Sequence, residues 1–181
     1  MLRNSKDIAL KKLYDEINNE LTPKISLVKC LVSYGFNHID PIKFEELILK
    51  IFEVFGYIGN LTQRSGDEGI DILLTDPEGS TVIVQCKRFT ELQNITPKEV
   101  REFVGSMVHA KAKYGYFITT TSFSNQAEEF CKNKEIILID GLRLKKLFLL
   151  AVKVEINKEQ YFAISKHFKI FIEENIDSVT L

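Results

Sequence analysis

The chain carries hydrophobic positions in two different periods, which predict helices and strands in turn. Apolar side chains spaced by three and four residues predict a helix that begins after Asp40-Pro41 and ends at Gly56. The apolar stripe of this helix consists of Phe44, Leu47, Ile48, Ile51, Phe52 and Phe55. Because residues advance by about 100° along a helix, Glu45 falls on the edge of the stripe. We therefore expect Glu45 to be a half-buried carboxylate.

A similar stripe upstream predicts a helical extension over residues 1–39. Its members are Leu10, Leu13, Tyr14, Ile17 and Leu21. Thr22-Pro23 then places a capping residue before a proline suited to the first turn of a further helix. We interpret residues 40–181 as the main domain that follows this extension.

Residues 66–89, with the sequence GDEGIDILLTDPEGSTVIVQCKRF, read as two strands joined by a tight turn. Asp76-Pro77-Glu78-Gly79 has the residue preferences of a type I turn. A left-handed Gly79 would make a hairpin in which Asp76 pairs with Ser80 and Leu73 lies opposite Ile83. The same register places Asp71 opposite Gln85, with Lys87 on the same face of the sheet two residues later.

Three polar groups thus converge at one end of an otherwise apolar hairpin, and two explanations fit them. Asp71 and Gln85 could hold a hard divalent cation such as Mg²⁺, with Lys87 beside it to activate water or stabilise charge on a phosphate. Alternatively, Asp71 and Lys87 form a partly buried ion pair bridged by Gln85. From the pattern alone the ion pair is favoured, because buried charges are usually paired.

The second half of the chain alternates helical and strand patterns. Thr96-Pro97-Lys98-Glu99 is a capping box that opens a helix reaching about Lys113. The segments that follow predict, in order, a strand, a helix, a strand and a helix: YGYFITTTSF, SNQAEEFCKN, EIILID and GLRLKKLFLL. Such alternation requires crossover connections and therefore a parallel part of the sheet. The tail from VKVEI onward predicts one more strand and a terminal helix.

Composition narrows the classes of protein that fit. With 181 residues and 45% hydrophobic content the chain can bury a full core. A formal net charge of −1 provides no general attraction to nucleic acid, so any such binding depends on a local patch. Cys30, Cys86 and Cys131 lack the spacing of a disulfide framework or a zinc site, which favours a reducing, cytoplasmic location. The sequence has no run apolar enough to span a membrane and no signal-peptide pattern.

Six ordered motifs together resemble the Mrr-like catalytic domain, the restriction endonuclease branch of the PD-(D/E)xK nucleases. They are FEELILKIFEVFGY, GDEGIDILL, VIVQCKRF, FVGSM, YGYFITTTSFSNQAEEF and ILIDGLRL, and they run from about Asp40 to Leu150. The resemblance implies an α/β fold, a restriction-endonuclease-like mixed sheet flanked by helices. It also implies metal-dependent cleavage of DNA with Mg²⁺, for which Mn²⁺ would substitute.

The resemblance assigns a role to each polar residue of the hairpin. Asp71 resembles the metal-binding aspartate, Gln85 the glutamine of the QxK variant and Lys87 the catalytic lysine, while Glu45 resembles the helix glutamate. The backbone carbonyl of Cys86 is expected to be a further metal ligand, with its side chain on the opposite face. The chain departs from the family at Glu68, where a second glycine is usual.

Contacts to DNA are predicted for three arginines and for hydroxyl groups after the YGYFIT strand. The residues are Arg64, Arg88, Arg101, Thr120 and Ser122. Arginines and hydroxyls suit phosphate oxygens. The alternatives are that the arginines are solvated surface groups and that the hydroxyls cap the next helix.

The sequence is accordingly interpreted as a DNA endonuclease that restricts foreign DNA. Two other functions fit the same fold: a DNA-binding or assembly module without hydrolysis, and a structure-selective nuclease such as a junction resolvase. A homodimer is compatible with the sequence. The target sequence or base modification, and the number of strands cut, are not encoded in any recognisable motif.

Overall fold

The computed structural model describes residues 35–62, 69–90 and 93–156. Its helices are α3 (Pro41–Val54), α4 (Pro97–His109), α5 (Asn125–Cys131) and α6 (Gly141–Ile156). Its strands are β1 (Ile58–Leu61), β2 (Ile72–Thr75), β3 (Thr81–Lys87), β4 (Tyr114–Thr119) and β5 (Ile136–Ile139). The helices predicted over residues 1–34 lie outside the described residues. Within the described ranges, no helix is both long and apolar enough to cross a membrane.

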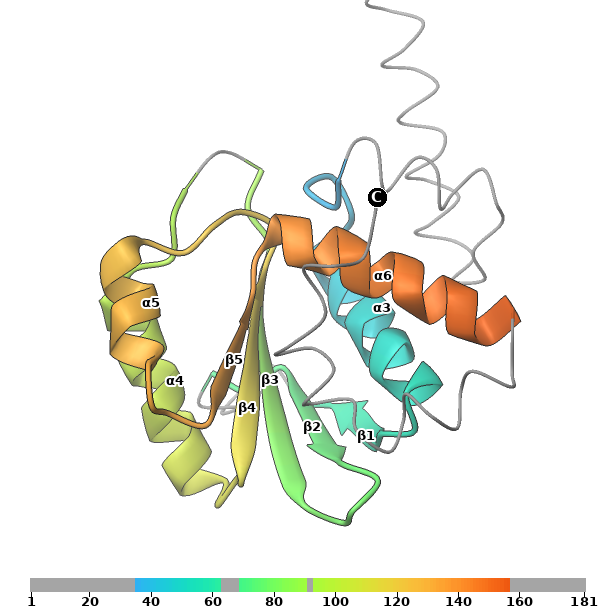
Figure 1. Cartoon of the computed structure of the whole chain (residues 1–181), viewed down its shortest axis with the longest axis horizontal. Helices are drawn as coiled ribbons and strands as arrows, with labels where there is room; N and C mark the ends of the chain where they lie inside the picture. The colour runs from blue at the N-terminus through green and yellow to red at the C-terminus, as the bar shows by residue number, and fades with distance from the viewer. Residues whose placement is uncertain (1–34, 63–68, 91–92, 157–181) are drawn as a thin grey trace, which may run out of the picture.

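The five strands form one mixed sheet in the order β1-β2-β3-β4-β5 (Figure 1). β1, β2 and β3 run antiparallel, whereas β3, β4 and β5 are parallel. Helices α3 and α6 cover one face of the sheet, and α4 and α5 cover the other (Figure 1). The α/β class and the flanked mixed sheet expected from the sequence are therefore confirmed.

Helix α3 forms as its sequence predicts. The Asp40 carboxylate accepts a hydrogen bond from the Ile42 N–H at 2.9 Å, which caps the first turn. The chain leaves the helix through Gly56, whose φ of +84° is readily adopted by glycine alone. The apolar stripe is buried against the sheet, and Glu45 on its edge is half-buried, as expected.

The β2–β3 hairpin has the predicted turn. Gly79 has a φ of +86°, the Asp76 N–H donates to the Ser80 carbonyl at 3.0 Å, and Leu73 pairs with Ile83. The Asp76 carboxylate also accepts the Ser80 N–H at 2.7 Å, which fixes the loop. The register that carries Gln85 and Lys87 to the end of the hairpin is therefore set locally.

Alternate residues of β3 enter two separate cores. Val82 and Val84 pack with α3 and α6, while Ile83 packs with α4 and α5. All three are fully buried, as expected of a central strand that is covered on both faces. The polar end of this strand therefore follows a segment that is packed on both faces by apolar side chains.

The secondary structure differs from the prediction in three places. The VKVEI segment continues α6 through Ile156 and is not a strand. Helix α4 ends at His109, where Lys111 turns the chain with a φ of +52°. Strand β1 was not predicted, since its sequence IGNL combines a glycine, an asparagine and an exposed Ile58.

Candidate active site

Asp71 lies at the entrance to β2, where the regular ladder stops. Its N–H donates to the Val84 carbonyl at 3.0 Å, although Val84 is already paired with Ile72. Two residues of one strand thus oppose one residue of the other, as in a β-bulge. The predicted backbone pairing of Asp71 with Gln85 is therefore replaced by a contact with Val84, and the regular β2–β3 ladder begins at Ile72.

The bulge aims the Asp71 side chain at β3. Its Oδ2 accepts a hydrogen bond from the Cys86 N–H at 2.6 Å, so the carboxylate replaces the backbone carbonyl that would continue the ladder. Cys86 stands between Gln85 and Lys87 in the sequence. The predicted proximity of Asp71 to the QxK segment is thus present, by a different contact from the one expected.

Gln85 and Lys87 share the face of β3 that carries Ile83, because side chains alternate along a strand. The Cys86 side chain points the other way and packs with the α3 and α6 core, as predicted. Lys87 is half-buried. A glutamine amide and an ammonium group therefore project together from the end of the central strand.

The Gln85 side chain is buried and incompletely hydrogen-bonded. It is 7% exposed, and its Oε1 atom is buried without a hydrogen-bond partner. Gly69 lies close beside it: a β-carbon at Gly69 would stand 3.3 Å from Gln85 Nε2 and 3.5 Å from Ser106 Oγ of α4. A buried acceptor that lacks a partner costs about 1–3 kcal/mol, and such an atom is usually satisfied by an ordered water or a bound ion.

Glu45 reaches the same region from α3. The pKa of the Cys86 thiol is raised well above its usual value, mainly by burial and then by the charges of Asp71 and Glu45. Both carboxylates therefore act on one side chain, which places both of them near Cys86. The raised pKa also keeps the Cys86 thiol protonated and unreactive.

The ion-pair explanation for these polar residues is not supported. Among the salt bridges between described residues, none joins Asp71 to Lys87. Asp71 instead accepts from the Cys86 backbone.

The available ligands fit a hard divalent cation. The Asp71 carboxylate, the unpartnered Gln85 Oε1 and the backbone carbonyl of Cys86 are all oxygen donors, which Mg²⁺ prefers. Within the described ranges, no group of three or more His, Cys, Asp or Glu side chains is arranged to hold a metal. A cation here would accordingly keep several of its waters, as Mg²⁺ does.

The predicted DNA contacts are distributed unevenly. Arg64 and Glu68 lie outside the described residues. Arg101 is exposed on α4, with its guanidinium carbon 5.7 Å from the centre of the Phe130 ring. Arg88 is half-buried, and its Nη1 donates to the Asn37 carbonyl at 2.7 Å.

The hydroxyl groups after β4, including that of Thr120, make hydrogen bonds within the protein. Thr120 is buried, and its hydroxyl accepts the Phe89 N–H at 2.9 Å and donates to the Phe89 carbonyl at 3.2 Å. Thr119 donates to the Lys87 carbonyl at 3.0 Å. Ser122 is exposed and donates to Asn94 at 2.7 Å. These bonds hold the chain after β3 against the chain after β4, a role that the sequence did not reveal.

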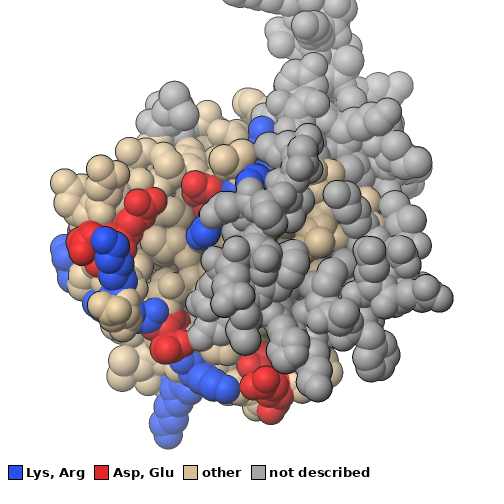
Figure 2. Space-filling model, viewed as in Figure 1, with Lys and Arg blue, Asp and Glu red and all other residues tan. Residues whose placement is uncertain are grey.

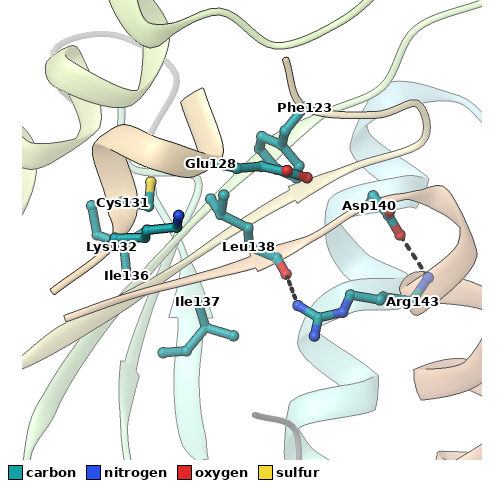
Figure 3. Close-up of a pocket in the computed structure, with 9 residues that line it drawn as sticks. All are labelled: Phe123, Glu128, Cys131, Lys132, Ile136, Ile137, Leu138, Asp140 and Arg143. Carbon is teal, nitrogen blue, oxygen red and sulfur yellow. Dashed lines mark hydrogen bonds between the residues drawn. The ribbon is translucent and has the colours of Figure 1, made fainter. Parts of the chain in front are cut away.

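The candidate residues are not part of the pocket drawn in Figure 3. That pocket, of about 540 Å³, lies beside β5 between α5 and the start of α6, and its lining includes Phe123, Cys131, Leu138 and Arg143. On the face shown in Figure 2, basic and acidic side chains are interspersed, in keeping with the net charge of −1. Polar residues at the end of β3 define the candidate site.

The arrangement of sheet and helices is that of restriction endonucleases. The structure is similar to the DNA modification-dependent restriction endonuclease AspBHI, with a TM-score of 0.51 and 16% identity over 84% of this chain and 42% of that chain. It is also similar to the restriction endonuclease FokI bound to DNA, with a TM-score of 0.50 and 16% identity over 81% of this chain and 30% of that chain.

The family follows from the sequence match. Residues 36–148 match the family model of the Mrr catalytic domain, described as a restriction endonuclease, and the chain belongs to this family. It is also 34% identical, over 152 residues, to the type IV methyl-directed restriction enzyme EcoKMrr of Escherichia coli (strain K12). That match covers 79% of this chain and 45% of the relative, so the chain spans less than half the length of the curated relative.

Proposed function

We propose that this chain is the catalytic domain of a metal-dependent endonuclease that hydrolyses DNA phosphodiester bonds in the restriction of foreign DNA. The observation that carries the proposal is the buried, unpartnered Gln85 Oε1 next to the Asp71–Cys86 hydrogen bond. This oxygen lies inside the segment that matches the family model, and its missing partner is supplied if a cation binds there.

In this proposal three residues hold the cation. The Asp71 carboxylate and Gln85 Oε1 bind Mg²⁺, or Mn²⁺ as a substitute, together with the Cys86 backbone carbonyl. A bound divalent cation would polarise the phosphate and lower the pKa of water. Because Asp71 is already held by the Cys86 N–H, its carboxylate is oriented before the cation arrives.

Lys87 and Glu45 act beside the cation-binding residues. The Lys87 ammonium shares a face of β3 with Gln85, from which it can orient the attacking water or stabilise negative charge on the phosphate. Glu45 supports the site from α3. The DNA backbone would be contacted by Arg64, Arg88, Arg101, Thr120 and Ser122, with the Thr120 hydroxyl also bonded to the Phe89 backbone.

The proposal also includes a cytoplasmic location and a homodimer. A reducing cytoplasm suits the dispersed cysteines. A homodimer would present two sites to the two strands of one duplex, and light scattering of the protein with and without DNA tests this arrangement.

One set of incubations tests the proposed function. Purified protein is mixed with methylated plasmid, unmethylated plasmid and a branched DNA junction, each with Mg²⁺, Mn²⁺, Ca²⁺ or a chelator. We expect plasmid cleavage with Mg²⁺ or Mn²⁺, and none with Ca²⁺ or the chelator. Cleavage confined to the junction would favour a resolvase. DNA binding without cleavage under every condition would favour a non-catalytic module.

A further inference from the structure

Arg88 connects the strand of the candidate site to the entrance of α3. It follows Lys87 directly, and its Nη1 donates to the Asn37 carbonyl at 2.7 Å, across 51 residues of sequence. By alternation along β3, Arg88 lies on the Cys86 side, the face that α3 and α6 cover. The contact therefore bridges the two elements that carry Lys87 and Glu45.

The acceptor of this hydrogen bond is held firmly. Asn37 is part of a turn closed by the Ile39 N–H, which donates to the Phe36 carbonyl at 3.2 Å. Phe36 and Ile39 are each 1% exposed, and the Phe36 ring packs edge-on against Phe148 of α6 at 5.7 Å. The turn leads straight into the α3 cap at Asp40. The Arg88 hydrogen bond thus ties the end of β3 to the turn that precedes α3.

The hydrogen bond to Asn37 does not by itself require a charged side chain at position 88. Its Nε is buried without a hydrogen-bond partner, and none of the salt bridges between described residues includes Arg88. A neutral donor would bind the Asn37 carbonyl without the cost of a half-buried cation. The guanidinium therefore adds positive charge beside Lys87, where an anionic phosphate would bind.

We infer that Arg88 is a positioning residue, which sets Glu45 beside the end of β3 by holding the Asn37 turn. This inference rests on the proposed nuclease function and deepens it. Arg88 acts through Glu45 without taking part in proton transfer, so its loss lowers the rate of the chemical step only while Glu45 is present.

A double-mutant cycle tests this dependence. Single-turnover cleavage rates are measured for the wild type, Arg88→Ala, Glu45→Gln and the double variant, with Mn²⁺ over hours so that slow variants remain measurable. Loss of a residue that orients a catalytic group commonly costs about 10–100-fold, which we expect for Arg88→Ala in the wild-type background. In the Glu45→Gln background the further loss should stay within about twofold. DNA affinity in Ca²⁺ should fall by less than the cleavage rate does, because one phosphate contact is lost while the others remain.

Arg143→Ala is the matched control. Arg143 is also half-buried, and its Nη1 donates to a backbone carbonyl, that of Leu138, at 3.0 Å beside the pocket in Figure 3. Any loss of cleavage rate caused by Arg143→Ala should be equal in the wild-type and Glu45→Gln backgrounds. If Arg88→Ala does not fold, Arg88→Lys replaces it, because lysine keeps the charge but loses the planar donor geometry.

The outcomes separate the two proposals. Equal losses in both backgrounds, or DNA affinity falling as far as the rate, would overturn the positioning role while leaving the nuclease function intact. A wild type that cleaves DNA with no metal present or added would overturn the proposed metal site. A wild type that never cleaves and does not bind Mn²⁺ would overturn both proposals.

Discussion

The carboxylate of Asp71 accepts the backbone N–H of Cys86 at 2.6 Å, and this bond takes the place of a rung in the β2–β3 ladder. One side chain thus completes the sheet and, in our proposal, binds the cation. The two roles can be separated, because an amide oxygen can accept the same N–H but carries no charge.

Asp71→Asn should therefore fold and lose cleavage and Mn²⁺ binding, whereas Asp71→Ala should also lose about 1–3 kcal/mol of unfolding free energy because Cys86 N–H is left unsatisfied. Denaturation curves and Mn²⁺ titrations measure both effects. Asp140→Asn is the control, since Asp140 accepts the Arg143 N–H at 2.8 Å at the start of α6. Full cleavage by Asp71→Asn would contradict the metal-binding role.

Lys87→Ala should abolish cleavage and leave folding and most DNA binding intact. Losing a group that activates water or stabilises charge commonly costs about 10²–10⁴-fold in rate. None of the salt bridges between described residues includes Lys87. The melting temperature of the Lys87→Ala protein should therefore differ little from that of the wild type. Lys113→Ala at the other end of the sheet, where Lys113 donates to Ser80 at 3.2 Å, is the control. Cleavage by Lys87→Ala at the wild-type rate would remove its catalytic role.

Gln85→Met should stabilise the metal-free protein while inactivating it. Methionine has nearly the same shape and removes the buried, unsatisfied Oε1, so unfolding free energy should rise by roughly 1–2 kcal/mol. Mn²⁺ should raise the melting temperature of the wild type but not of this variant. Gln126→Met, at an exposed position of α5, should change neither property. A less stable Gln85→Met protein would show that Oε1 has a partner in solution.

The protein should become less stable in alkali, partly through Cys131. Burial raises the pKa of its thiol from 9.0 to about 11. Between these values the unfolded chain ionises while the folded chain does not, so the free energy of unfolding falls as pH rises from about 9 to 11. Urea denaturation at a series of pH values should show a shallower decline for Cys131→Ala than for the wild type. An unchanged slope would indicate that the folded thiol ionises normally.

Tyr114→Phe should reduce stability and spare cleavage. The Tyr114 hydroxyl donates to Asp76 Oδ2 at 3.0 Å and lies 3.0 Å from the Tyr57 hydroxyl, in a buried cluster that also includes Tyr116. Removing it leaves polar partners unsatisfied, at a cost of about 1–3 kcal/mol. The cluster is at the hairpin-turn end of the sheet, opposite the end of β3. A loss of cleavage at full stability would show that this end contributes to activity.

Much of the fold was predictable because its signals are local. The Asp40 cap, the type I turn at Asp76–Gly79 and the stripe of α3 each lie within one short segment and fix α3, β2 and β3. Strand β1 has no such signal. It is an edge strand in which a β-carbon at Gly59 would stand 2.2 Å from the Leu73 carbonyl, so tertiary contact selects the glycine there.

The candidate site was predictable in its members but not in its geometry. Counting residues back from the turn gives the correct register as far as Ile72, after which the Asp71 side chain competes with the backbone for Cys86 N–H. The Arg88–Asn37 contact and the Thr120–Phe89 bonds join segments 51 and 31 residues apart. Neither contact produces a hydrophobic periodicity in the sequence, because each joins two segments that meet only in the folded protein.

The position of β3 in the middle of the sheet also governs when the site can exist during synthesis. Glu45, Asp71, Gln85 and Lys87 all precede β4 in the chain, yet β3 is completed only when β4 pairs with it from Val82 to Lys87. The Lys87 carbonyl in particular accepts bonds from Thr119 and Thr120. A nascent chain that ends before β4 would carry every proposed catalytic residue without the strand that holds them in place. If the proposed function holds, a product that ends there would lack a formed site for cutting DNA.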